Sequence, residues 1–289
     1  MPQQYLDPQY DPELGNHTQT RYMYYGMVKC LDEGIGNGAK PKQPLLTSAS
    51  SCVSLACAAV TAAVKAVPGA WDNTLLVFSA DNGGETRGGG NNWPRRGGKY
   101  TDFEGGTSVA AFVSGGYLPA SVRGSNSSAI IHICDWHLTF SKLAGAAPPP
   151  PVPAGVPAMD SIDAWPALST GGPSQRTEVP LSVNSLVVKN WKLVTNQAAG
   201  GKNNWQNPQW PDGSTTPGPA CDPCLFDLSA DPLEKTNLVN DSSHASLLKE
   251  LTDRLAQLKA TKWQTGDDGY RGPYLLCQTF LLTLATFPI

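Results

Sequence analysis

The sequence predicts an α/β fold joined to a smaller α+β part, and three observations carry this prediction. The apolar run Leu75–Phe78 has no polar alternation and indicates a strand buried on both faces, as in a parallel sheet. Residues 21–36 repeat apolar side chains every four positions, which is typical of a helix packed on a sheet. Near the end, several short strands precede one amphipathic helix, a combination that favours a small α+β domain. We therefore expect a larger unit over 1–170 and a smaller one over 171–289.

The elements of the larger unit follow from local patterns. The proline-rich stretch Ala146–Pro157 cannot form a helix or a central strand, so it predicts a linker or a surface crossing. After the helix at 21–36, the elements are expected at Val60–Val67 (helix), Leu75–Ser79 (strand), Val109–Gly115 (buried strand) and Ile130–Ala144 (a turn running into a helix capped by Asp135).

The smaller unit carries strand patterns and then a helix pattern. Leu186–Val194 alternates like an antiparallel hairpin around Lys189-Asn190, and Cys224–Leu228 predicts another short strand. The helix is expected where leucines recur along one face, with capping candidates before it: Leu247, Leu251, Leu255 and Leu258, preceded by Asp241 and Ser242.

Composition excludes some classes of partner. A formal net charge of -3 leaves no basic field for nucleic acid. No apolar stretch reaches the roughly 20 residues that a membrane span needs, and the first residues do not resemble a signal peptide. We therefore expect neither a nucleic-acid partner nor a membrane span.

Cysteines and sequons carry weaker signals. The chain has 7 cysteines, and Cys221 and Cys224 form a C-x-x-C pair for which a structural or disulfide role is favoured over zinc. Three acceptor sequons, at Asn16, Asn126 and Asn240, favour a secretory route.

The stretch that carries chemistry is Asp81-Asn82-Gly83-Gly84, directly after the Leu75–Ser79 strand. Carboxylate and amide oxygens suit Ca²⁺ or Mg²⁺, and ligands gather beyond the carboxyl ends of strands in α/β sheets. Gly83 and Gly84 are expected to allow positive φ angles. An ordinary surface turn has the same composition, and Lys99 alone would be a solvated lysine. The stretch by itself leaves both interpretations open.

The full segment DNGGETRGGGNNWPRRGGKYTDFEGG (Asp81–Gly106) resembles the formylglycine-dependent sulfatases, particularly the arylsulfatase B group. The resemblance implies an alkaline-phosphatase-like fold, a mixed sheet flanked by helices, incomplete here. It extends over most of the chain, though only over the carboxyl-terminal portion of the family's length. Supporting segments are Tyr24–Asn37, Leu75–Ser79, His132–Gly145, Pro223–Leu238 and Trp263–Tyr270.

The resemblance also implies roles for particular residues. Asp81 and Asn82 would be two ligands of one Ca²⁺, and Lys99 would contact a sulfate or leaving-group oxygen. Glu104 would support the turn into the next strand. The neighbouring loop residues would shape the rim or serve the structure: Asn91, Asn92, Trp93, Arg95 and Arg96.

Other polar residues are expected to be structural. His132 and His137 lie five apart with Asp135 between them, and we expect packing or capping roles for both histidines because nothing nearby completes a ligand set. Cys134 is expected to be a core residue.

The family's nucleophile, formylglycine, derives from a cysteine in a C-x-P-S-R context, and none of the 7 cysteines lies in one. Without it we expect a truncated form with little or no sulfatase activity. Residues 38–59 interrupt the family pattern between Asn37 and Val60. We interpret them as an intron read in frame or a surface insertion, and transcript reads joining Asn37 to Val60 would support the intron. Leu281–Ile289 raises the same question.

The sequence thus predicts a sulfuric ester hydrolase that acts on a sulfated small molecule or glycan, in a secreted or lysosomal location. Two alternatives remain. One is a non-catalytic protein that binds sulfated glycans, and the other is a metal-dependent phosphohydrolase of the same superfamily. The phosphohydrolase is less favoured because its di-metal site needs more Asp and His ligands than a chain with 4 histidines offers in these contexts.

Overall fold

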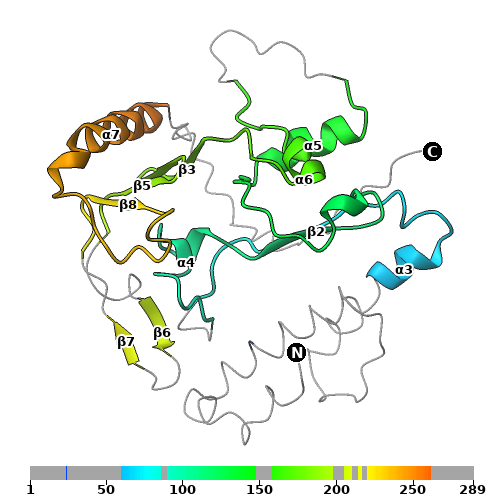
Figure 1. The fold of residues 1–289 in the computed structure, drawn as a ribbon, viewed down its shortest axis with the longest axis horizontal. Coiled ribbons are helices and arrows are strands. Elements are labelled where there is room, and N and C mark those ends of the chain that lie inside the picture. The colour runs from blue at the N-terminus through cyan, green and yellow to red at the C-terminus, as the bar shows by residue number, and fades with distance from the viewer. Residues whose placement is uncertain are drawn as a thin grey trace, which may run out of the picture.

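A computed structural model of the 289-residue chain describes residue 24 and residues 60–85, 90–147, 158–197, 205–209, 214–216 and 220–261. Figure 1 shows α4 between a four-stranded sheet and a two-stranded ribbon, with α7 across the sheet. The elements are α3 (Val60–Ala66), β1 (Leu76–Ser79), α4 (Glu104–Thr107), β2 (Ala111–Ser114), η3 (Ala120–Val122), α5 (Asp135–Leu143), α6 (Trp165–Thr170), β3 (Glu178–Ser182), β4 (Ser185–Val188), β5 (Trp191–Val194), β6 (Trp205–Gln209), β7 (Ser214–Thr216), β8 (Cys224–Asp227), η5 (Ser242–His244) and α7 (Ala245–Ala260).

Strands β1 and β2 form an antiparallel ribbon, in which Leu76 pairs with Ser114 and Phe78 with Phe112. The two phenylalanine rings stack with their centroids 5.2 Å apart. Both predicted strands therefore exist, but the expected burial on both faces in a parallel sheet is wrong for the described part of the chain. Each strand has one partner there, so most of its side chains are half-buried or exposed.

Strands β3, β4, β5 and β8 form an antiparallel sheet in that order. The predicted hairpin is confirmed, since Val188 pairs with Trp191 across the two-residue turn. Lys189 adopts a positive φ of 54°, the left-handed conformation that tight hairpin turns need. The strand expected at Cys224–Leu228 is confirmed as β8.

Helix α7 covers this sheet. Leu251 and Leu255 are buried against leucines of β4, β5 and β8, which are Leu186, Leu193 and Leu225. The predicted leucine stripe is therefore the packing face. Asp241 does cap, but it caps η5 by accepting from the Ser243 backbone N–H at 2.9 Å, and Ser242 makes no cap.

The predicted helices at Val60–Val67 and after Ile130 are confirmed as α3 and α5. The expected helix at 21–36 lies outside the described residues except for Tyr24, which is helical. The insertion at 38–59, residues 148–157 of the proline-rich stretch and Leu281–Ile289 also lie outside. Among the described residues, no helix combines the length and apolar character that a membrane crossing requires. The predicted fold class, α/β with a smaller antiparallel α+β part, agrees with this architecture.

Candidate functional site

The candidate site begins where β1 ends, at Asp81 and Asn82. Asp81 is exposed, and one of its oxygens, Oδ1, accepts from the Asn82 backbone N–H at 2.9 Å. The Asn82 amide donates through Nδ2 to the Gly83 carbonyl at 2.8 Å. The Asn82 amide nitrogen is therefore engaged with the backbone, which fixes the orientation of a side chain whose oxygen is a metal-ligand type.

Gly83 lies against the turn of α4. Its backbone N–H donates to the Gly106 carbonyl at 2.8 Å, and a Cβ at Gly83 would overlap the Gly105 carbonyl oxygen. Neither Gly83 nor Gly84 has a positive φ among the described glycines, so the expectation based on φ is wrong. These positions need glycine because two backbone segments approach too closely for a side chain.

Asn92 closes the loop back onto Gly84. Its Oδ1 accepts from the Gly84 N–H at 2.7 Å, and its Nδ2 donates to the carbonyls of Gly84 at 2.9 Å and Gly97 at 3.3 Å. Of the two roles open for Asn92, the structural one therefore applies. Asn91 and Trp93 are exposed, and a rim role for them stays a prediction.

Lys99 reaches the same place through its backbone, because its N–H donates to the Gly84 carbonyl at 3.2 Å. Its side chain is half-buried, with Nζ 5.5 Å from the centroid of the Tyr100 ring. No ion pair joins Lys99 to Asp81 among the described side chains. The fold thus brings the backbones of the predicted residues together, whereas convergence of their side chains stays a prediction.

Behind the loop lies a buried charge cluster that the sequence patterns did not reveal, made of Arg96, Glu104, Lys192 and Glu234. Lys192 on β5 is fully buried, and its Nζ lies 2.9 Å from Glu104 and 2.9 Å from Glu234. Burial opposes the charge of Lys192, but the two carboxylates outweigh it and raise the pKa of the amine.

Arg96 is the cation that the loop contributes to this cluster. Its guanidinium carbon, Cζ, lies 3.9 Å from the centroid of the Phe103 ring. It is 1% exposed, and burial lowers its pKa to about 10, with Glu234 and Asp231 opposing the shift. Of the rim and structural roles open for Arg96, the structural one therefore applies. Arg95 stays exposed and donates to the Ser108 carbonyl.

The segment around α5 is structural. Asp135 is buried in the first turn and accepts from the His132 and Ile162 backbone N–H groups at 2.8 Å each, and from the Arg176 guanidinium. Burial alone would raise the pKa of Asp135, but these hydrogen bonds, Arg176 foremost, lower it. Asp135 is therefore a partner of distant groups rather than the expected helix cap.

The two histidines and Cys134 differ in burial. His132 is half-buried with Nδ1 2.9 Å from the Cys134 sulfur, which agrees with a structural role. His137 is exposed on α5, which contradicts the packing half of the expected packing or capping role. Cys134 is half-buried rather than a core residue.

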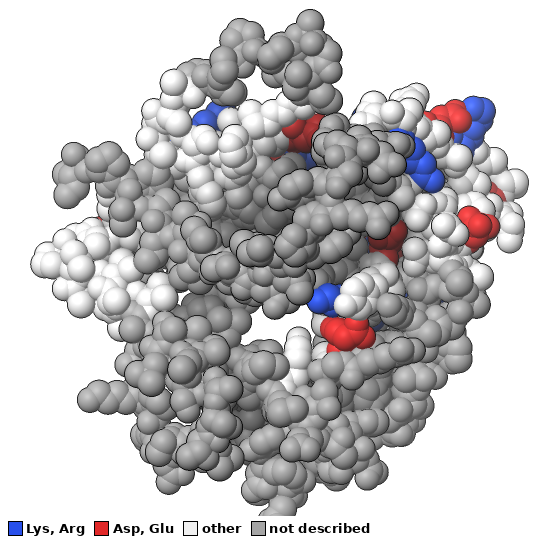
Figure 2. All heavy atoms as spheres, turned by 180° about the vertical axis from the view of Figure 1, so that it is seen from behind, with Lys and Arg blue, Asp and Glu red and all other residues white. Residues whose placement is uncertain are grey.

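The remaining cysteine and sequon predictions can be checked in part. Cys221 and Cys224 form a disulfide within a buried cluster, which supports the disulfide reading. Asn126 and Asn240 are exposed, and Asn16 lies outside the described residues. Figure 2 shows that, among the described residues, basic and acidic side chains are interspersed on one face of the molecule.

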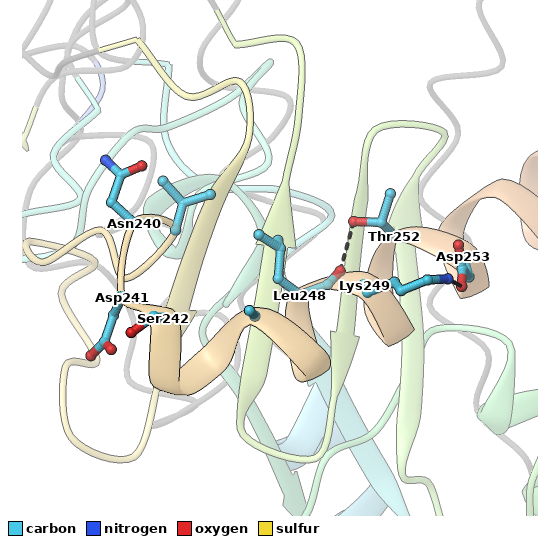
Figure 3. A pocket seen from close by; sticks show the side chains of 9 residues that line it. Asn240, Asp241, Ser242, Leu248, Lys249, Thr252 and Asp253 are labelled. Atoms are coloured by element: carbon cyan, nitrogen blue, oxygen red, sulfur yellow. Dashed lines mark hydrogen bonds and ion pairs between the residues drawn. The ribbon is translucent and has the colours of Figure 1, made fainter.

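A cavity of about 330 Å³ lies beside the start of α7, away from the DNGG loop. Figure 3 shows Lys249 turned toward Asp253 and the Thr252 hydroxyl bonded to the Leu248 carbonyl at this cavity. Lys249, Thr252 and Asp253 are thus paired within α7, so the cavity does not carry a second candidate site.

The chemistry of the donor set tests whether a cation fits the DNGG loop. Asp81 and Asn82 offer carboxylate and amide oxygens, the hard ligands that Ca²⁺ takes. In the described part of the chain, no group of three or more His, Cys, Asp or Glu side chains is arranged to hold a metal. The two residues therefore fit part of a Ca²⁺ shell, which needs six or more oxygens.

The fold has a counterpart among solved structures. The chain is similar to a solved structure titled "Crystal structure of Ps i-CgsB", with a TM-score of 0.53 and 22% identity over 84% of this chain and 44% of that one. At this identity the likeness establishes a shared fold. No family model matches the chain.

Two sequence relatives of the chain are sulfatases. The chain is 27% identical over 274 residues to arylsulfatase J of Mus musculus, covering 83% of this chain and 40% of that protein. It is 28% identical over 204 residues to N-acetylgalactosamine-6-O-sulfatase of Bacteroides thetaiotaomicron, covering 65% and 37%. The chain thus spans about two fifths of the length of these relatives, and its resemblance to the sulfatase family is confirmed.

Proposed function

We propose that the chain carries the metal- and sulfate-binding loop of a sulfuric ester hydrolase of the arylsulfatase type. Asp81 and Asn82 would supply two oxygen ligands to one Ca²⁺, and Lys99 would hydrogen-bond a sulfate or leaving-group oxygen. The observation that carries the proposal is the closure of the loop, in which the Gly84 carbonyl accepts hydrogen bonds from the Asn92 side-chain amide and from the Lys99 backbone N–H. Because of this closure, Lys99 lies in the same loop region as Asp81, although the two residues are 18 positions apart in the sequence.

The chemistry of the residues fits this role. A bound Ca²⁺ would neutralise charge on the sulfate ester, and a lysine ammonium stabilises charge that develops on an oxygen. Lys99 is half-buried, so its charge is less screened than that of a fully exposed lysine. The names of the two sequence relatives support a sulfate ester on an aryl group or a sugar as the substrate.

A second candidate is a protein that binds sulfated glycans without cleaving them. The observation in its favour is the loop itself, because a lysine held beside Gly84 can recognise an anion without any covalent step. Such a protein would use the loop and Lys99 for anion recognition alone.

We also propose a secreted or lysosomal location. Two sequons, at Asn126 and Asn240, are exposed where a glycan could be attached, and the Cys221–Cys224 disulfide is a bond of oxidising compartments.

The test combines binding with turnover on the purified chain. Ca²⁺ is titrated by calorimetry into the wild type and into Asp81→Ala, with the exposed Asp72→Ala as the matched control. Hydrolysis of 4-nitrophenyl sulfate and of 4-nitrophenyl phosphate is followed in parallel. Heparin and desulfated heparin serve as glycan probes, with Lys99→Ala as the variant.

The outcomes separate the candidates. Sulfate hydrolysis that depends on Ca²⁺ and Asp81 supports the hydrolase. Binding of heparin but not of desulfated heparin, lost in Lys99→Ala and without hydrolysis, supports the glycan-binding protein. Hydrolysis of the phosphate ester alone would favour a phosphohydrolase. A chain that binds neither Ca²⁺ nor heparin overturns both proposals.

A further inference from the structure

The buried charge cluster joins two parts of the molecule that are distant in sequence. Arg96 and Glu104 come from the segment that closes the DNGG loop, whereas Lys192 lies on β5 and Glu234 follows β8. Each side therefore supplies one cation and one anion. Figure 1 shows α4, which begins at Glu104, facing the sheet that carries β5 and β8.

The contacts in the cluster fix α4 closely against the sheet. Lys192 bridges the Glu104 and Glu234 carboxylates at 2.9 Å each. The second Glu234 oxygen accepts from the Glu104 backbone N–H at 2.7 Å, and the Glu234 carbonyl accepts from Arg96 at 3.4 Å. Glu234 thus holds both side-chain and backbone groups of the opposite segment.

Burial restricts the positions that these charged groups can take. Lys192 and Glu234 are both 0% exposed, and Arg96 is 1% exposed. A buried charge without its partner is strongly unfavourable, so these three groups tolerate few alternative positions. Glu234 also holds a left-handed φ of 56°, a conformation that a non-glycine residue keeps only where its surroundings demand it.

The position of α4 is transmitted to the loop through the backbone. Gly105 and Gly106 follow Glu104, and the Gly105 N–H donates to the Arg96 carbonyl at 2.6 Å. The Gly106 carbonyl accepts from the Gly83 N–H at 2.8 Å, next to Asn82. A displacement of Glu104 would therefore shift Gly83, which follows Asn82, and Arg96, which lies three residues before Lys99.

We propose that Lys192 and Glu234 are positioning residues, through which the carboxyl-terminal sheet sets the placement of the Asp81–Asn82 segment and of Lys99. The consequence for ligand binding rests on the proposed function. The placement of the loop does not, so it can be measured separately.

The test separates positioning from stability. In Lys192→Met/Glu234→Leu, apolar groups replace one buried cation and one buried anion together, so the variant is expected to lose less stability than either single substitution, while the bond to the Glu104 N–H is lost. Hydrogen exchange is followed at the Gly83, Lys99 and Gly105 amides, which all donate within the loop. We expect their exchange to accelerate about tenfold or more, a change of about 1.4 kcal/mol.

Arg254→Met is the matched control, because it breaks the ion pair of α7 with Glu178 on the same sheet without touching the loop. It should leave the three loop amides unchanged. Unchanged loop exchange in the double variant overturns the proposal. Should the double variant fail to fold, Glu104→Gln, which breaks the link from α4 to Lys192 and leaves the fully buried Lys192–Glu234 pair intact, must accelerate the same three amides and not those of α7.

Calorimetric titration with Ca²⁺ distinguishes this proposal from the proposed function. If the wild type binds Ca²⁺, the double variant should bind it about tenfold more weakly, while Arg254→Met binds it normally. If the wild type binds none, the proposed function fails and the exchange data alone decide the positioning role.

Discussion

Asn92 carries more of the loop's closure than any sequence motif indicates. One side chain receives the Gly84 N–H and donates to two carbonyls, so it replaces hydrogen bonds that regular secondary structure would otherwise supply. The adjacent Asn91 is exposed and accepts from the Trp93 N–H at 2.9 Å. The two neighbouring asparagines are therefore expected to contribute very differently to the stability of the loop.

We expect Asn92→Ala to lower the free energy of unfolding by about 1–3 kcal/mol, because half-buried backbone groups lose their partners. Asn91→Ala should stay within about 0.5 kcal/mol of the wild type. Urea denaturation of both variants checks this. Equal losses in the two variants would contradict the role given to Asn92.

Asp135 is a second residue whose partners are fixed by the fold, since Arg176 lies 41 positions away. We expect Asp135→Asn to lower the free energy of unfolding at pH 7 by about 3–5 kcal/mol, the cost of breaking a buried ion pair. Asp163→Asn, which breaks a more exposed pair with Lys142, should cost about 1 kcal/mol or less.

The pH dependence of Asp135 has a definite sign. Its pKa is lowered from the ordinary value of 3.8, so the stability that it contributes is present above that pH and is lost as the pH falls through the lower folded pKa. Below pH 3.8 the difference between the wild type and Asp135→Asn should therefore shrink. A difference that stays constant in urea titrations from pH 7 to pH 2.5 would contradict this.

At the scale of elements, α7 is the clearest case in which a sequence pattern determines packing. Its leucine stripe meets leucines from three strands, and Leu251 is 1% exposed. We expect Leu251→Ala to cost about 2–5 kcal/mol, from lost transfer free energy and a residual cavity. The exposed Glu250→Ala should change the stability by less than about 0.5 kcal/mol. Thermal unfolding of both variants measures the difference.

Elements with local signals could be predicted from the sequence. The β4–β5 hairpin, β8, α5 and α7 follow from periodicity and turn residues within a few positions. The pairing of β1 could not be predicted, because an apolar run indicates a strand without naming its neighbour. The parallel neighbours expected on both sides are replaced by one antiparallel partner in the described residues.

The candidate site was predictable in part for the same reason. Asp81, Asn82 and Lys99 stand in a recognisable segment, and a hydrogen bond joins the Lys99 backbone to Gly84, two residues after Asn82. The buried charge cluster carries no local signal, since Lys192 and Glu104 are 88 positions apart and Glu104 and Glu234 are 130 apart. Lys192 sits in an alternating strand, where a lysine ordinarily indicates the solvent face.

At the scale of the whole molecule, the loop and the carboxyl-terminal sheet share a core. Phe103 from the loop is buried together with Val194, Phe226 and the Cys221–Cys224 pair. We expect the two parts to unfold in one transition, because neither buries its apolar surface alone. Hydrogen exchange in rising urea, followed at the Gly83 and Leu251 amides, should give the same midpoint. Separate midpoints would contradict a shared core.

The equal division of charge across the cluster has an evolutionary consequence. Because the loop and the sheet each supply one acid and one base, neither side carries an excess charge that would repel the other. Because Lys192 and Glu234 are both fully buried, a change at either one strands the other in the interior, and only a second change relieves that penalty. Lineages descended from this protein should therefore inherit or abandon Lys192 and Glu234 as a pair.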